Sequence, residues 1–88
     1  FLLQNDVYVA TEVSHDTNRL YFHLETGETV QIEKYQDTLR RRVNQKGHEI
    51  YARNIHSFSL HSLPYGIIVS IETTKGGIYE RTLITNKK

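Results

Sequence analysis

The sequence predicts a mainly β domain, an antiparallel meander of about six strands that follows a short helical segment at the N-terminus. Hydrophobicity has a period of two, clearest in residues 20–25, where Leu20, Phe22 and Leu24 alternate with Tyr, His and Glu. Short stretches rich in Gly, Asn, Pro and Thr interrupt this alternation and indicate turns. With 38% hydrophobic and 24% charged residues, the 88-residue chain has a globular composition and room for one core. Residues 1–88 are therefore predicted to form one domain.

The start of the chain shows no clean period. Residues 1–6 are interpreted as the end of a helix, and residues 7–13 as an extended or irregular connection, because Val7, Val9 and Val13 disfavour a helix. The apolar residues at the very start fit the end of a longer element better than a free terminus. We therefore expect a longer helix to precede this chain.

Extended segments follow one another along the rest of the chain. After residues 20–25 the turn "TGET" leads into "TVQIEK", residues 29–34, where the alternation continues. In the second half "NIHSFSLHSL", "IIVSIET" and "IYERTLI" are predicted strands, at residues 54–63, 67–73 and 78–84. The turns "LPYG" and "TKGG" separate them, and the last two strands form a hairpin. Such a meander has one apolar face that little in the chain can cover, so we expect a preceding helix or a partner chain to cover it.

Residues 38–55 are predicted to form a basic hairpin, because they hold five of the eleven Lys and Arg residues. In "TLRRRV" the alternation places Leu39, Arg41 and Val43 on one face and the other three residues on the opposite face. The following "NQKG" has the composition of a hairpin turn, after which the chain returns as a strand.

This hairpin provides the candidate binding residues for nucleic acid or for a protein partner, namely Arg40, Arg42, Lys46, His48 and Arg53. Such a finger can contact several phosphates, and Tyr51 is close enough in sequence to stack on a base. The alternative is that outward-facing charges only keep the sheet soluble. Arg41 shares the apolar face, so we expect it to form an ion pair, with Glu33 or Asp37, or to extend to solvent at the end of the sheet.

The charge is unevenly distributed along the chain. Residues 1–37 hold seven acidic and two basic residues, whereas residues 38–88 hold nine basic and three acidic residues. Two interpretations stay open. The domain is a dipole suited to complementary neighbours, or strands from the two halves pair in one sheet and neutralise each other.

The sequence offers no pattern typical of a metal, cofactor or catalytic site, and we expect no enzyme. There is no Cys, and the five His residues include no H-x-H or H-x-x-x-H pair. Ser59 and His61 are close in sequence, but no G-x-S-x-G motif accompanies them. Gly76 and Gly77 lack the Lys and Ser or Thr of a phosphate-binding loop, and are interpreted as a hairpin turn.

At this point the order of segments is similar to that of a known family. "LRRRVNQKGHEI" followed by "NIHSFSLHSLPYGIIVSIET" resembles the C-terminal domain of the competence minor pilin family ComGF of Gram-positive bacteria. The basic strand, the "KGH" turn, the "NI-x-x-F" step and the short loop before a β-branched strand carry the resemblance. It is most specific over residues 39–73, and the spacing of "LYFHLETGETVQIEKY" extends it to nearly the whole chain.

The resemblance implies a pilin-like α+β fold and a minor pilin of a competence type IV pilus, at the cell surface, involved in DNA uptake. Such proteins have an apolar N-terminal helix that anchors them in the membrane before assembly and then packs into the filament and against the domain's sheet. Minor pilins start pilus assembly or form the tip, so the implied partners are other minor pilins and the major pilin, with DNA contact weak or indirect. A coarser similarity to pseudopilins of type II secretion keeps a secretion role as the alternative.

Overall fold

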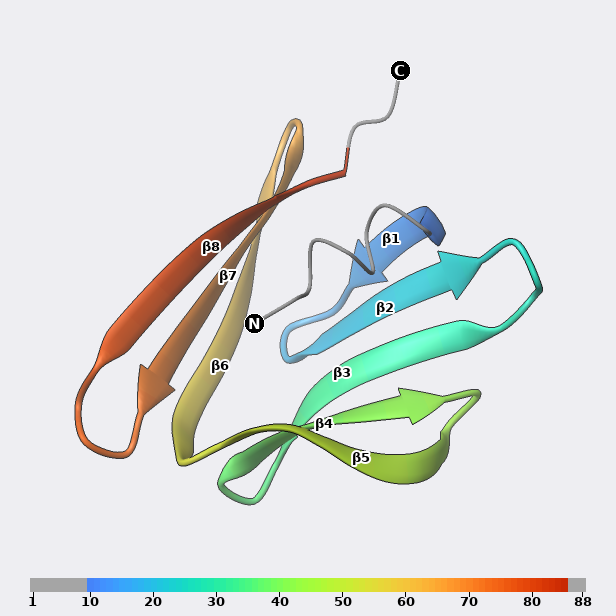
Figure 1. Ribbon diagram of the computed structural model, residues 1–88. Coiled ribbons are helices and arrows are strands. Elements are labelled where there is room, and N and C mark those ends of the chain that lie inside the picture. Colours follow the sequence, from blue (N-terminus) through green and yellow to red (C-terminus); the bar gives the residue numbers. More distant parts are fainter. Residues whose placement is uncertain (1–9, 86–88) are drawn as a thin grey trace.

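The computed structural model describes residues 10–85, which form eight strands in two antiparallel sheets (Figure 1). The first sheet has five strands in the order β1-β2-β3-β4-β5, and the second has three in the order β6-β7-β8. The strands are β1 (Ala10–His15), β2 (Arg19–Leu24), β3 (Thr29–Tyr35), β4 (Thr38–Val43), β5 (Lys46–Arg53), β6 (Ile55–Leu63), β7 (Gly66–Thr73) and β8 (Ile78–Ile84).

The antiparallel, mainly β fold predicted from the sequence is confirmed. Residues 10–85 form eight strands instead of about six, and these divide between two sheets instead of forming one meander. Part of the difference lies in β1, because residues 10–13, expected to be an extended or irregular connection, belong to a strand that pairs with β2. The predicted helical segment at residues 1–6 lies outside the described residues. No helix within residues 10–85 is long and apolar enough to cross a membrane.

Both sheets contribute to one hydrophobic core. Leu20 and Phe22 of β2 and Ile32 of β3 are fully buried in the first sheet, as is Leu83 of β8 in the second. Together with the apolar residues of β6 and β7 they form a single buried cluster. The second sheet thus covers part of the apolar face of the first, although little in the chain was expected to do so. Cover by a preceding helix or a partner chain stays a prediction.

A tight corner between β5 and β6 sends the chain from one sheet to the other. Asn54 lies there with φ of 61°, a left-handed conformation that Asn tolerates better than most residues. The N–H of Ile55 donates to the carbonyl of Asp37 at 2.8 Å, and the N–H of Thr74 donates to the carbonyl of Asn54 at 2.9 Å. These two bonds hold the corner against a turn of each sheet (Figure 1).

The predicted basic hairpin is formed by β4 and β5. Its two-residue loop consists of Asn44 and Gln45, with φ of 52° and 63°, which is the geometry of the turn that matches strand twist in hairpins. Gly47 follows with φ of 86°, where the register between the two strands shifts. The extra residue forms a bulge in β5 between Lys46, which lies opposite Val43, and Glu49, which lies opposite Arg41.

Candidate functional site

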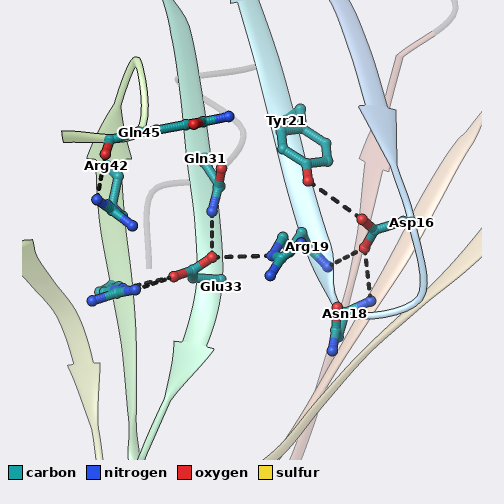
Figure 2. A network of polar contacts seen from close by, with 9 residues as sticks. Asp16, Asn18, Arg19, Tyr21, Gln31, Glu33, Arg42 and Gln45 are labelled. Atoms are coloured by element: carbon teal, nitrogen blue, oxygen red, sulfur yellow. Dashed lines mark hydrogen bonds and ion pairs between the residues drawn. The ribbon is translucent and has the colours of Figure 1, made fainter.

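The outer face of the first sheet, which points away from the core, is a connected polar network (Figure 2). Antiparallel pairing places Arg19 of β2 opposite Glu33 of β3, and Glu33 opposite Arg40 of β4. Directly opposite residues in a sheet point to the same face, so the carboxylate lies between two guanidinium groups. A single row across three strands therefore joins residues from the acidic and the basic halves of the chain.

Glu33 is the centre of this network and is only 7% exposed. Its Oε1 accepts a hydrogen bond from Arg19 Nε at 3.2 Å and another from the amide of Gln31, and its Oε2 accepts from Arg40 Nη2 at 2.6 Å. Burial acts to raise the pKa of Glu33. The hydrogen bonds from Arg40 and Gln31, with the charges of Arg40 and Arg19, outweigh burial and hold the pKa below its usual 4.5. Glu33 is thus a stable carboxylate with both oxygens in use.

Arg40 is held in place by the fold on three sides. Besides its ion pair with Glu33, its guanidinium lies 4.1 Å from the centre of the Tyr35 ring, a cation–π contact. The ring of His48 contacts Tyr35 edge-on at 5.3 Å, and its Nδ1 accepts a long hydrogen bond from Arg40 Nη1 at 3.4 Å. With only 17% of its side chain exposed, Arg40 mainly serves the fold.

Arg42 retains hydrogen-bonding capacity that its described neighbours do not use. Its Nη2 donates to the carbonyl of Gln45, whereas its Nε is buried and has no hydrogen-bond partner within residues 10–85. It borders a hollow of about 310 Å³, the arginine hollow, whose wall consists of Arg19, Tyr21, Gln31, Glu33, Arg40, Arg42 and Gln45.

Asp16 closes the network at the β1–β2 turn (Figure 2). Its side chain accepts the N–H groups of Asn18 at 3.1 Å and of Arg19 at 2.9 Å, and the hydroxyl of Tyr21 at 3.3 Å. The hydrogen bond from Asn18 is the main cause that lowers the pKa of Asp16. The neighbouring Tyr21, followed by the charge of Glu33, raises the pKa of Arg19. The carboxylate of Asp16 therefore already accepts hydrogen bonds from its own turn and from Tyr21.

The five residues singled out from the sequence do not form one site. Arg40 and Arg42 share one face and line the same hollow, as the alternation predicted, and His48 Nδ1 lies 3.4 Å from Arg40 Nη1. Lys46 is exposed beside the turn, and Arg53 borders a different cavity of about 520 Å³ between the sheets, together with Ile55 and Ile71. The basic hairpin exists, but its charges point in different directions.

Arg41 forms an ion pair, as expected, but the expected partners are wrong. Arg41 pairs with Glu49 of β5 at 3.4 Å, and not with Glu33 or Asp37. The reason is register, because Arg41 lies opposite Glu49 and on the other face of the sheet from Glu33. Tyr51, suggested as a base-stacking residue, is half-buried and packs against the core.

Sequence reasoning missed Arg19, which is far from the hairpin in the chain. Its signal is the alternation itself, since Arg19 and Tyr21 occupy the polar positions of β2, in phase with Gln31 and Glu33 of β3. The pairing of Glu33 with Arg40 also supports one interpretation of the uneven charge, in which strands from the two halves neutralise each other. That interpretation holds at the border of β3 and β4.

The histidines take part in local contacts. His15 Nε2 lies 2.7 Å from Ser62 Oγ, and its Nδ1 lies 2.9 Å from the carbonyl of Asp16, so this side chain links the first sheet to the second. His23 lies between Ser14 and Thr29 on the outer face. Within residues 10–85 no three His, Cys, Asp or Glu side chains are grouped so that they could hold a metal ion.

Comparison with known proteins identifies the family. The family model of the competence protein ComGF matches residues 1–79. The chain belongs to the ComGF family. No curated protein and no solved structure matches it. The ComGF chain is thus a competence-related protein, and the matched part ends where β8 begins.

Proposed function

We propose that this ComGF protein is a non-enzymatic minor pilin of a competence type IV pilus that takes part in DNA uptake during transformation. The observation that carries the proposal is the ComGF family match over residues 1–79. Its role is in the start of pilus assembly or in the tip complex. Its partners are other minor pilins and the major pilin, at the outer face of the cell membrane and on the cell surface. The full protein is anchored before assembly by a helix that precedes this domain.

The surface of the domain is consistent with contacts to several neighbours. The cavity of about 520 Å³ between the sheets has an apolar floor that includes Ile55, Val69 and Ile71, and Tyr79 stands at its edge with 65% exposure. The turn around Lys46 and the rim at Arg53 supply positive charge at other places. Separate apolar and charged areas suit a subunit that meets different partners on different sides.

A gene deletion with three readouts tests the proposal. Loss of transformation together with loss or shortening of pili, both restored by the intact gene, is the expected result. Normal pili and normal transformation in the deletion strain would contradict a pilin role. A defect in protein secretion with normal transformation would favour the alternative, a type II secretion pseudopilin.

The second candidate function is direct DNA binding through the hairpin of residues 40–53. The structure gives less support to binding by all five candidate residues together. Arg40 is occupied by Glu33 and Tyr35, and Arg53 lies at another cavity. Any phosphate contact on this side of the molecule must therefore rest on other arginines.

A further inference from the structure

The arginine hollow holds more positive charge than the fold neutralises. Three guanidinium groups, from Arg19, Arg40 and Arg42, surround the single carboxylate of Glu33. Both oxygens of Glu33 already accept hydrogen bonds, so the carboxylate has no capacity left for Arg42. The Asp16 carboxylate lies beyond Arg19, outside the lining of the hollow, and is bonded to its own turn and to Tyr21.

Two of these arginines have donors to offer. Arg19 uses Nε for its ion pair, and 51% of its side chain is exposed. Arg42 has a buried Nε without a partner among the described residues, which is a costly state for a charged group. Both residues line the hollow, so an oxyanion that enters it can accept hydrogen bonds from their guanidinium groups. Arg40 stays engaged with Glu33 and contributes its charge at the floor.

The shape of the surface favours a polymer over a single anion. A second hollow of about 240 Å³ adjoins the first and shares Arg19, Glu33 and Arg40 with it. Lys34 and the 41% exposed Tyr35 line its other side. A chain with regularly spaced phosphates can place successive groups in both hollows, whereas one carboxylate fills only one. Aromatic rings beside cations on a sheet face are also typical of surfaces that bind single-stranded nucleic acid.

We propose that the arginine hollow binds a phosphate group of a single-stranded nucleic-acid backbone, with Arg19 and Arg42 as the contacting residues. This inference rests on the proposed function, in which the protein meets DNA. It keeps Arg42 of the hairpin and joins it to Arg19 of β2, in place of the other hairpin residues. Guanidinium groups suit this ligand because their planar donors pair with two phosphate oxygens at once. Glu33 acts as a positioning residue that holds Arg19 and Arg40 on either side.

The test is the binding of a fluorescein-labelled 15-nucleotide oligothymidine to the 88-residue chain, measured by anisotropy between 20 and 200 mM salt. With so few contacts we expect a dissociation constant near the weak, non-specific range of about 10⁻⁴–10⁻⁶ M. Arg19→Gln and Arg42→Gln are each expected to weaken binding several-fold. Each is also expected to reduce the slope of log affinity against log salt by about 0.7, the value for one phosphate contact on a single strand.

A matched control distinguishes contact from general charge. Arg41→Gln removes the same charge from the same strand, but on the opposite face, and is expected to leave the affinity and the salt slope nearly unchanged. Arg42→Lys keeps the charge and is expected to retain most of the salt slope. Circular dichroism melting of each variant confirms that it folds.

Three outcomes would overturn the proposal. These are equal binding by wild type and by both hollow variants, an equal loss with Arg41→Gln, or displacement of the oligonucleotide by polyglutamate as readily as by unlabelled oligonucleotide. The last result would assign the hollow to an acidic protein partner. Binding by the purified chain and the phenotype of the gene deletion are independent measurements, so failure of this inference and failure of the pilin proposal can be told apart.

Discussion

The two sheets of this ComGF domain share one core but differ on their outer faces. The first sheet buries a carboxylate there, with Glu33 7% exposed among arginines, and the ion pairs Arg19–Glu33 and Arg40–Glu33 cross its strands. The second sheet instead exposes apolar side chains, with Ile78 at 67% and Ile84 at 50%. The first sheet thus presents a polar surface joined by ion pairs, whereas the second presents apolar side chains. Pairs of matched substitutions, made in the two sheets or on the two faces of one strand, test this difference.

The largest effect is expected in the shared core. Leu20→Ala in the first sheet and Leu83→Ala in the second remove fully buried side chains, and each is expected to lower the free energy of unfolding by about 2–5 kcal/mol. Urea denaturation measures both. Ile78→Ala, at an exposed position of the same strand as Leu83, is the control and should change stability by less than about 0.5 kcal/mol. A small effect of Leu83→Ala alone would show that the second sheet contributes little to the core.

The next effect separates two neighbouring arginines of β4. Arg40→Gln leaves the buried Glu33 with one ion-pair partner fewer, and we expect it to cost about 2 kcal/mol. Arg41→Gln breaks a pair whose acid, Glu49, has a side chain that is 65% exposed, and we expect a cost below about 1 kcal/mol. Equal effects in chemical denaturation would show that the outer face is no more rigid than an ordinary solvent-exposed surface.

A fall in pH is expected to lower the stability of the protein mainly through a carboxylate of the first sheet. The pKa of Glu33 is lowered on folding, so its contribution to stability is complete above pH about 4.5 and is lost as the pH falls through the lowered value. The slope is at most about 1.4 kcal/mol per pH unit for this one proton. Thermal unfolding between pH 6 and pH 3 measures it. Glu33→Gln should flatten the curve, and a pH response of this variant as steep as that of the wild type would contradict the assignment.

Much of the first sheet was predictable, because its alternation is regular. Leu20 and Phe22 point inward and Arg40 and Arg42 outward, as a period of two requires. The sequence does not show which residues of neighbouring strands lie opposite each other. Arg41 pairs with Glu49 because of the shift near Gly47, and one residue of slip would have placed His48 or Ile50 opposite Arg41.

The division into two sheets was harder to predict than the strands themselves. The chain passes from one sheet to the other at Asn54, which has a left-handed backbone. The carbonyl of Asn54 and the N–H of Ile55 form the hydrogen bonds of this corner. A run of alternating residues looks the same whether it continues a sheet or begins a new one. Arg53 ends the hairpin opposite Thr38, as predicted, but it also borders the cavity between the sheets.

The smallest effect compares the tight turns of the two sheets. In the first sheet Gln45 occupies a left-handed conformation with φ of 63°, which costs a non-glycine residue free energy, whereas in the second sheet Gly76 takes φ of 88°. Gln45→Gly is expected to raise stability by about 0.5 kcal/mol, because the Asn-Gly pair suits this hairpin turn and the carbonyl that accepts Arg42 is kept. Gly76→Ala should lower stability by about 1 kcal/mol although no atom lies within 4 Å of the added methyl group, since the strain is in the backbone alone. Melting temperatures at neutral pH measure both changes. A gain from Gln45→Gly without loss of oligonucleotide binding would show that the turn only closes the hairpin. Weaker binding would show that the Gln45 side chain, in the wall of the arginine hollow, also contributes to binding.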